Sequence, residues 1–553
     1  MANTDIVFGI DLGTTYSCIA YVDEYGKPVV IPNVEGDRTT PSVVQFEGSN
    51  RIVGKEAKNN AVLYPNQVVE MVKRHMGTSD WVFTYEGVDY RPEEISSYIL
   101  RKLVGDAEQY LGQPIKEVVI TCPAYFGIAQ REATARAGQI AGLNVREVIN
   151  EPTAAAIMYG LQSEKDQVVL VFDLGGGTFD ITIIEIKGGA ITVVATGGDH
   201  YLGGRNWDGA IVQYLAQEWV NETGSSEDPT DSAETQQDLW NKAESAKRTL
   251  SARQETTVPV MHAGERVGVK LTREKFDELT AGMLERAIEY TKTTIAEAAK
   301  RGYSHYDQIL LVGGSTKMPQ VVERLQKEFP NIPQRSFDPD EAVAKGAAIY
   351  GQKLMLDEKI QIKIAEMTGQ DVEDVNAAQV PQQVKERAQQ EVARESGLRT
   401  SVVEKFNAIS VTNVSSHCFG VIALNRAEQE IIANMILVND PLPFTRTETF
   451  YTVQANQQVV DDQVMENSVS EYEVSDITLG EEIGNATLHL PPRLPLHAPI
   501  EVTFELNQEG RLHVTAREVS SNRLVDVTIQ IKLGIPEEEL AAAQARATRL
   551  SVS

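Results

Sequence analysis

Two segments far apart in the chain combine aspartate, glycine and threonine in nearly the same order. In each, an apolar strand ends at an aspartate, a turn of glycine and threonine follows, and a second strand leaves the turn. Glycine lets the backbone approach a ligand closely, consecutive N–H groups bind anions, and threonine hydroxyls add donors. The repetition predicts two phosphate-binding turns that close on one nucleotide from two lobes. The residues are Asp11, Gly13, Thr14 and Thr15 in the first segment, and Asp173, Gly175, Gly176, Gly177 and Thr178 in the second.

The paired aspartates predict a divalent cation. Asp11 and Asp173 would stand at strand ends facing the same phosphates, where negative charges repel each other unless a cation lies between them. Mg²⁺ bridges phosphate oxygens and carboxylate-held water molecules, which suits this arrangement. Either motif alone could be an ordinary strand cap or turn, but the repetition and a third glycine turn, Gly313–Gly314, favour a functional site. Neither a Walker sequence nor the glycine fingerprint of dinucleotide-binding proteins occurs.

A third group of polar residues shares one face of a predicted helix. Glu244, Lys247, Arg248 and Ser251 follow at intervals of three and four residues, which places them on the same side. Such a face could bind a ribose and the edge of an adenine. The spacing alone fits a solvated Glu244–Arg248 ion pair equally well.

The elements that must position these residues change in character along the chain. Residues 1–355 alternate short apolar strands with helical patterns, as α/β layers do, whereas residues 407–534 contain evenly spaced alternating strands typical of a β-sandwich. Between them, residues 356–406 form a highly charged helical segment with a thin apolar stripe, which we interpret as a solvated spacer. Residues 535–553 are expected to begin a helix. The fold class is therefore α/β plus all-β.

Composition limits the partners and the compartment. The net charge of −28 argues against nucleic acids and anionic membranes as partners, because both require basic surface. No apolar run is long enough to span a membrane, and no signal peptide precedes the first strand. The three cysteines match no metal-binding spacing and suit a reducing compartment, so we expect a cytoplasmic protein.

Seven motifs together resemble those of the seventy-kilodalton heat-shock chaperones of the DnaK type. They are Gly9-Ile-Asp-Leu-Gly-Thr-Thr-Tyr-Ser, Cys122-Pro-Ala-Tyr-Phe, Asn150-Glu-Pro-Thr-Ala-Ala-Ala, Phe172-Asp-Leu-Gly-Gly-Gly-Thr-Phe-Asp, Ala246-Lys-Arg-Thr-Leu-Ser, Val312-Gly-Gly-Ser-Thr and Asp338-Pro-Asp-Glu-Ala-Val-Ala. The match is close over residues 1–355 and looser over residues 410–534. The resemblance implies an actin-like ATPase domain of two lobes, followed by a β-sandwich that binds extended peptides.

The resemblance also implies roles for single residues. Lys73, Glu151, Asp173 and Thr178 match residues around the attacking water and the γ-phosphate. Asp11 and Asp173 match acids that order Mg²⁺ through water, and Asp180 with Asp11 and Thr178 matches sites for K⁺. Pro123 and Arg131 match a relay between the nucleotide and the second domain. The residues expected to bind the nucleotide are Gly13, Thr14, Thr15, Tyr16, Gly175, Gly176, Gly177, Gly203, Gly204, Glu244, Lys247, Arg248, Ser251, Gly313, Gly314, Ser315, Lys317 and Asp340.

This chain departs from the family pattern in four places. Lys317 stands where the family stacks an arginine on adenine, and lysine stacks less well. The stretch 406–416 replaces the short acidic, leucine-rich linker, and the inserted segment precedes it. Asp462 falls among the apolar positions of the peptide groove, which by counting are Val421, Phe450 and Val460. Finally, residues 535–553 leave room only for the start of a truncated lid helix.

Three functions fit the sequence to different degrees. The first is an ATP-dependent chaperone that binds unfolded or extended polypeptides, with a J-domain co-chaperone and a nucleotide-exchange factor as possible partners. The second is a nucleotide-regulated adaptor that binds little client, which the altered linker, Asp462 and the short lid favour. The third, a small-molecule kinase of the same two-lobed fold such as a sugar kinase, ranks last because the β-sandwich has no obvious use in such an enzyme.

Overall fold

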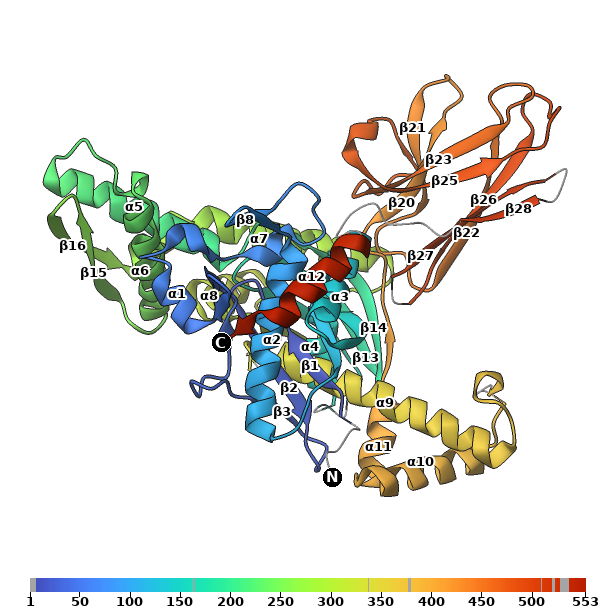
Figure 1. The fold of residues 1–553 in the computed structure, drawn as a ribbon, viewed down its shortest axis with the longest axis horizontal. Helices are drawn as coiled ribbons and strands as arrows, with labels where there is room; N and C mark the ends of the chain where they lie inside the picture. The colour runs from blue at the N-terminus through green and yellow to red at the C-terminus, as the bar shows by residue number, and fades with distance from the viewer. Residues whose placement is uncertain are drawn as a thin grey trace.

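The computed structural model describes residues 6–161, 163, 165–336, 338–375, 379–508, 510–519, 523–527 and 537–553. Its side-chain description omits residues 461, 462, 486, 523–527 and 537. Part of the expected β-sandwich, residues 528–534, and the start of the expected tail, residues 535–536, therefore lie outside the described residues. A large α/β body carries a separate β-domain at one end (Figure 1).

The first lobe of the α/β body is built on a mixed sheet in which the N-terminal hairpin is central. The strand order is β11-β10-β1-β2-β3, with β4 paired to β2. β1 runs antiparallel to β2 and parallel to β10. The strands are β1 (Phe8–Asp11), β2 (Tyr16–Val22), β3 (Pro28–Ile31), β4 (Thr40–Pro41), β10 (Glu117–Cys122) and β11 (Asn144–Asn150).

Smaller elements complete this lobe. A second sheet has the order β29-β6-β5-β7, and β8 pairs with β9. The strands are β5 (Val44–Glu47), β6 (Asn50–Val53), β7 (Val68–Val69), β8 (Phe83–Tyr85), β9 (Val88–Tyr90) and β29 (Ser551–Val552). The helices are α1 (Lys55–Asn60), α2 (Pro92–Leu111) and α3 (Ile128–Ile140), with short 3-10 turns η1 (Pro65–Gln67) and η2 (Val72–His75).

The second lobe repeats the hairpin at the centre of its own sheet. The order is β18-β17-β12-β13-β14-β19, with β12 antiparallel to β13 and parallel to β17. Its strands are β12 (Gln167–Leu174), β13 (Phe179–Lys187), β14 (Ala190–Asp199), β17 (Gln308–Val312), β18 (Gln334–Ser336) and β19 (Ser410–Thr412). A separate two-stranded sheet consists of β15 (Glu255–His262) and β16 (Glu265–Thr272). The helices are α5 (Gly204–Thr223), α6 (Ala233–Ala252), α7 (Arg273–Lys300) and α8 (Pro319–Glu328), with η3 (Pro229–Asp231) and η4 (Gly314–Lys317). The hairpins predicted from both repeated segments are thus confirmed.

Two helices join the lobes at the base of the cleft between them. α4 (Glu151–Gly160) packs against α9 (Ala342–Thr368), and together they contact strands of both central sheets. A Cβ atom at Gly346 of α9 would lie 1.8 Å from the carbonyl oxygen of Ala154, so the helices cross at backbone distance and glycine is required there. α9 continues through position 355, where the sequence suggested the end of the first domain.

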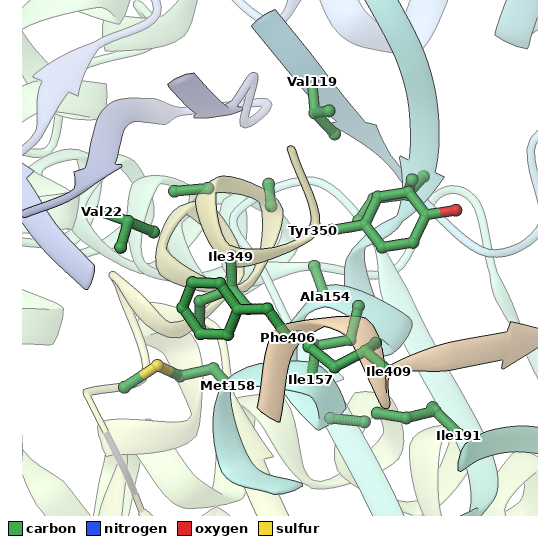
Figure 2. Close-up of a cluster of buried hydrophobic side chains, with 14 of the residues drawn as sticks. Val22, Val119, Ala154, Ile157, Met158, Ile191, Ile349, Tyr350, Phe406 and Ile409 are labelled. Atoms are coloured by element: carbon green, nitrogen blue, oxygen red, sulfur yellow. The ribbon is translucent and has the colours of Figure 1, made fainter. Parts of the chain in front are cut away.

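The inserted segment belongs to this packed base. It forms η5 (Val372–Asp374), α10 (Gln382–Ser396) and α11 (Thr400–Asn407), and both α-helices pack against α9. The expectation of a solvated spacer is wrong for its apolar stripe, because Ala388 and Val392 are fully buried. Figure 2 shows Phe406 and Ile409 among buried side chains of α4 and α9.

The linker that follows is held as a strand. β19 pairs in parallel with β14 and forms one edge of the second lobe's sheet, with Val411 opposite Ile191. The start of the linker is fixed from two sides, since Phe406 is buried and the side-chain amide of Asn407 donates to Asp357 Oδ1 at 2.6 Å. The chain therefore reaches the β-domain from a fixed point on the second lobe.

The β-domain consists of two antiparallel sheets around one apolar core. Their orders are β24-β21-β20-β23-β25 and β22-β26-β27-β28. Phe419, Val464, Val502, Phe504 and Val514 are among the buried side chains between them. The elements are β20 (Cys418–Leu424), β21 (Glu430–Ile436), β22 (Phe444–Tyr451), β23 (Val459–Asn467), β24 (Glu473–Val474), β25 (Gly480–His489), β26 (Pro499–Leu506), β27 (Leu512–Glu518), β28 (Arg523–Val527) and η6 (Ile477–Leu479).

The C-terminal helix α12 (Glu537–Arg549) packs on the first lobe, against α2 and α3, and not over the β-sandwich (Figure 1). The guanidinium group of Arg546 donates to both carboxylate oxygens of the fully buried Glu94, at 3.0 and 2.6 Å. Strand β29 then pairs with β6, and the amide of Ser553 donates to the carbonyl of Arg51. No helix in the described part of the chain is both long and apolar enough to cross a membrane.

Burial of the Phe406 ring yields a prediction about the inserted segment. Phe406→Ala should lower the free energy of unfolding of the α/β body by about 3–5 kcal/mol, because it leaves a cavity in the shared core. All four tryptophans (Trp81, Trp207, Trp219 and Trp240) lie in this body, so their fluorescence during urea unfolding reports on it. As a control, Ile362→Ala on α9, where the side chain is 40% exposed, should cost less than about 1 kcal/mol. Equal effects of the two substitutions would refute a structural role for the segment.

Candidate functional site

The two aspartate–glycine turns face each other across the cleft and touch. A Cβ atom at Gly176 would lie 2.1 Å from Thr15 Oγ1, and one at Gly177 would lie 2.4 Å from Thr14 Cγ2. A methyl group at either position would collide with a threonine side chain of the opposite lobe. The glycines are therefore needed here for close approach, as the sequence pattern suggested.

Neighbouring loops hold the second turn in place. Gly203 lies so close that a Cβ atom would be 2.5–2.6 Å from backbone atoms of Gly177 and Thr178. The amides of Gly204 and Arg205 donate to the carbonyls of Gly175 and Gly176, at 2.9 and 2.7 Å. The hydroxyl of Ser315, from the third glycine turn, donates to the carbonyl of Gly175 at 2.9 Å.

These turns line one cavity of about 360 Å³, a volume in the usual range for a small-molecule site. Most residues predicted from the sequence line it. They are Asp11, Gly13, Thr14, Thr15, Tyr16, Lys73, Glu151, Asp173, Gly175, Gly176, Thr178, Glu244, Lys247, Arg248, Ser251, Gly313, Gly314, Ser315, Lys317 and Asp340. Gly177, Gly203, Gly204 and Asp180 are not part of the lining. Gly177 belongs to the second turn, and Gly203 and Gly204 contact its backbone.

The floor of the cavity carries more buried acid than base. Asp173, Asp180 and Glu151 are each less than a tenth exposed, and Asp11 stands at the end of β1 beside them. Lys73, on η2, pairs with Glu151 through Nζ and Oε1 at 2.5 Å. With all four acids ionised, this single lysine leaves the group with a negative charge that water does not solvate.

The pKa values of these acids are shifted as burial and mutual repulsion predict. Burial first, and then repulsion from Glu151, raises the pKa of Asp11 to about 7. The same two causes raise the pKa of Asp173 and of Asp180 well above the ordinary value. Burial works against the charge of Lys73, but Glu151 and Asp11 outweigh it and raise the pKa of Lys73. A cation that entered this group would relieve the repulsion.

The surroundings of Asp180 show whether this group of acids suits a bound cation. Its carboxyl group accepts hydrogen bonds from the amides of Ala124 and Tyr125, yet Oδ1 is buried without a hydrogen-bond partner. Among the described residues, no three carboxylate, imidazole or thiolate side chains converge closely enough to bind a metal directly. The group therefore suits a hydrated Mg²⁺ whose remaining ligands are water molecules and phosphate oxygens.

The helix face on α6 closes the other end of the cavity. Glu244 accepts a hydrogen bond from Tyr16 Oη at 2.9 Å and pairs with Arg248 at 2.7 Å and with Lys58 of α1. Although burial opposes it, Lys58 and Arg248 lower the pKa of Glu244 to about 2. The Glu244–Arg248 pair is thus not simply solvated, because partners from the first lobe reach it across the cleft.

Two further side chains at this end are also paired. Lys247 Nζ lies 2.8 Å from Asp208 Oδ1 and donates to the carbonyl of Gly204. Lys317 of η4 forms an ion pair with Asp340. The cavity thus combines an acidic floor beside two glycine turns with an end that is rich in hydrogen-bond donors and acceptors.

Sequence reasoning missed several residues that connect the lobes. Arg74 donates through Nε and Nη2 to the carbonyl of Gly177, at 3.1 and 2.6 Å, and so reaches from η2 into the opposite turn. Lys58 and Asp208 line the cavity but belong to no motif. Arg74 follows Lys73 directly, which is the one clue that the sequence offered; Lys58 lies in a polar helix with nothing to distinguish it.

Comparison with known protein families found a match over most of the chain. A family described as "Hsp70 protein" matches residues 7–375 and 392–552. The match therefore includes both hairpins, the cavity and the β-domain. Its internal gap, residues 376–391, lies in the inserted segment and covers most of α10.

Proposed function

Because the chain belongs to the Hsp70 protein family, whose members are ATP-dependent chaperones, we propose that it hydrolyses ATP to control the binding of unfolded polypeptides. ATP would bind in the cleft between the lobes, and its state would change the affinity of the β-sandwich for extended peptides. The observation that carries the proposal is the contact of Gly176 and Gly177 with Thr15 and Thr14. It brings two phosphate-binding turns to the same cavity, as a triphosphate gripped from both sides would require.

The residues present fit a magnesium ion. Asp11 and Asp173 would hold it through water, and the buried surplus of carboxylate charge supports its presence. Bound there, Mg²⁺ would neutralise the phosphate charge that develops during transfer. K⁺ is a further proposal: Asp180, Asp11 and Thr178 would supply oxygen ligands, and the orphaned Oδ1 of Asp180 supports it.

Lys73 and Glu151 are the proposed catalytic pair. Lys73 is buried on the cavity floor, so its charge is screened little by solvent and can act on the γ-phosphate and the attacking water. Glu151 keeps the lysine oriented and protonated through their ion pair. Thr178 Oγ1 stands beside the same turn and would position the water.

The nucleoside would lie between α6 and the third glycine turn. Glu244 and Lys247 offer an acceptor and a donor for the ribose, while Arg248 and Lys317 flank the space for the base. Lys317 is committed to Asp340 and cannot stack as an arginine would, so we expect weaker adenosine binding than with arginine at this position.

The β-sandwich is the proposed peptide-binding domain. Of the three apolar groove positions found by counting, Val421 is fully buried, whereas Phe450 and Val460 pack against the core only in part. Asp462 pairs with Ala486 in the strand register, but its side chain lies outside what the structure describes. Phe450 and Val460 are therefore the better candidates for contact with a client.

A second function, the nucleotide-regulated adaptor, draws support from the inserted segment. α11 buries Phe406 in the base of the α/β body and anchors the linker strand β19 beside β14. A linker anchored in this way resists release, and an adaptor would bind nucleotide without peptide-driven turnover. The third candidate, a sugar kinase, gains no support from these contacts.

Replacement of the buried lysine tests the catalytic assignment. Lys73→Ala should lower the turnover number for ATP about 10²–10³-fold while leaving ATP affinity within severalfold, because the lysine stabilises charge in the transition state. Single-turnover hydrolysis and equilibrium binding of a fluorescent ATP analogue separate the two effects. Lys55→Ala is the matched control, since Lys55 is an exposed lysine of the same lobe. Wild-type turnover in Lys73→Ala would rule out the assignment.

Peptide affinity in the two nucleotide states tests the proposed chaperone cycle. We expect an unfolded client peptide to bind the full chain at least several-fold more weakly in ATP than in ADP, and saturating peptide to raise ATP turnover by a similar factor. Fluorescence anisotropy of a labelled peptide and steady-state hydrolysis measure the two effects. Peptide binding in neither state, together with intact ATP turnover, would establish the adaptor instead.

A further inference from the structure

The β-sandwich meets the α/β body at the start of helix α3 (Figure 1). Gly127 occupies the N-cap position of this helix and has no side chain with which to cap it. Ser416, at the entrance to the β-sandwich, donates its hydroxyl to the carbonyl of Phe126 at 3.3 Å. Ile128, the first residue of α3, packs against the core of the β-sandwich.

Glu466 of strand β23 takes the place of the missing cap. Its carboxyl group accepts a hydrogen bond from the amide of Ile128. A Cβ atom at Gly127 would lie 2.1 Å from Glu466 Oε1, so only glycine leaves room for the carboxyl group. Helix N-termini favour such acceptors because their first amides lack partners within the helix.

His417 completes the contact. Its Nδ1 lies 3.1 Å from Glu466 Oε1, and the two side chains are only 15% and 10% exposed. Burial, and next the charge of Glu481, raises the pKa of Glu466 to about 8. Burial, followed by the nearby His200 and Arg131, lowers the pKa of His417 to about 3. Between these values the docked pair therefore carries one proton.

The capped segment leads to the catalytic residues. Arg131 of α3 donates through Nε to the carbonyl of Phe126 at 3.1 Å and through Nη2 to Oδ1 of Asn150. Asn150 immediately precedes Glu151, the partner of Lys73. On the other side, the amides of Ala124 and Tyr125 donate to Asp180.

We propose that Glu466 is a positioning residue through which the β-sandwich acts on the catalytic centre, by capping α3 across the domain boundary. When the domains are docked, the cap fixes the segment 124–131 and with it Asn150, Glu151 and Asp180. When they separate, the N-terminus of α3 loses its cap. The inference rests on the proposed ATPase activity only for its effect on turnover; the docking itself does not depend on it.

Docking should depend on pH, because Glu466 and His417 bind protons differently in the docked and the separated states. When separated and solvated, Glu466 and His417 would titrate near 4.5 and 6.5. Above about pH 6.5 the separated pair holds no proton while the docked pair keeps one, so docking takes up a proton and weakens as pH rises to about 8. The docking constant should then fall by up to about tenfold per pH unit. Between about pH 4.5 and 6.5 both states hold one proton and docking should be constant.

Docking can be measured directly in the full chain by energy transfer. Tyr110→Cys on α2 and Tyr451→Cys on β22 provide exposed labelling sites in the two bodies, and the three native cysteines are buried. In the otherwise wild-type chain we expect constant transfer from pH 5 to 6.5 and a decline from pH 6.5 to 8. A flat profile, or a rise with pH, would overturn the proposal.

Three variants separate the cap from its charge. Glu466→Gln keeps an acceptor for the Ile128 amide and cannot ionise, so it should remain docked at pH 8. Gly127→Ala should displace the carboxyl group and reduce docking at every pH. Glu430→Gln, an exposed carboxylate of the same domain, should follow the wild-type profile. An unchanged pH profile in Glu466→Gln would overturn the role of Glu466.

Turnover of ATP, measured on the same samples, tests the positioning role. If the cap acts on the catalytic centre, turnover in Gly127→Ala should differ at least several-fold from wild type at pH 6. For Glu466→Gln we compare the ratio of turnover at pH 8 to turnover at pH 6 with the same ratio in Glu430→Gln, which corrects for other effects of pH. After this correction, Glu466→Gln should turn over ATP equally fast at both pH values. Altered docking with unchanged turnover would overturn the positioning role. Absence of hydrolysis in every sample would instead refute the proposed ATPase, while the energy-transfer result would still decide the docking.

Discussion

The contact between two glycine- and threonine-bearing turns from different lobes is the constraint on which the cleft depends. Gly176 and Gly177 leave no space for a side chain against Thr15 and Thr14, so the separation of the two central sheets is fixed to within a methyl group at this point. The base of the body has a matching constraint, because Gly346 packs against the carbonyl of Ala154 where α9 crosses α4. The lobes are thus held together at two points, the contact between the turns and the crossing of α4 and α9. Movement of one lobe relative to the other is therefore expected to be mainly a rotation about the line that joins these two points.

Electrostatics complements that geometry. Asp11, Asp173, Asp180 and Glu151 share one lysine, and burial makes the excess negative charge costly. A fold built only for stability would favour neutral side chains at such positions. The opposite end of the cavity is already neutralised, since Glu244 is paired with Lys58 and Arg248. The deficit of positive charge is thus confined to the floor, where a phosphate chain would bring its own cation.

The sequence predicted what depends on local pattern. Both hairpins, their aspartates and the polar face of α6 follow from alternation, glycine turns and helical spacing, and most of the predicted residues line one cavity. Contacts between distant segments were missed. Arg74 reaches Gly177 and Lys58 reaches Glu244 only because the lobes are folded together, and neither residue stands in a distinctive motif. For the same reason the stripe around Val392 looked too thin to be buried, and nothing in residues 537–553 indicated that Arg546 would reach Glu94.

The attachments of the β-sandwich differ greatly in strength, and this difference decides where its movement must begin. The chain enters the domain from β19, fixed on the second lobe by the burial of Phe406, whose loss would cost several kcal/mol. It ends with α12 and β29 on the first lobe, fixed by apolar packing and the Arg546–Glu94 pair. At the start of α3 the domain is held by the partly buried Ile128 and by the hydrogen bonds of Ser416 to Phe126 and of Glu466 to Ile128, each bond with a net contribution of about 1 kcal/mol. These weaker contacts at the start of α3 would therefore break before the burial of Phe406 or the packing of α12, and they lie beside the residues that hold Glu151 and Asp180 in place.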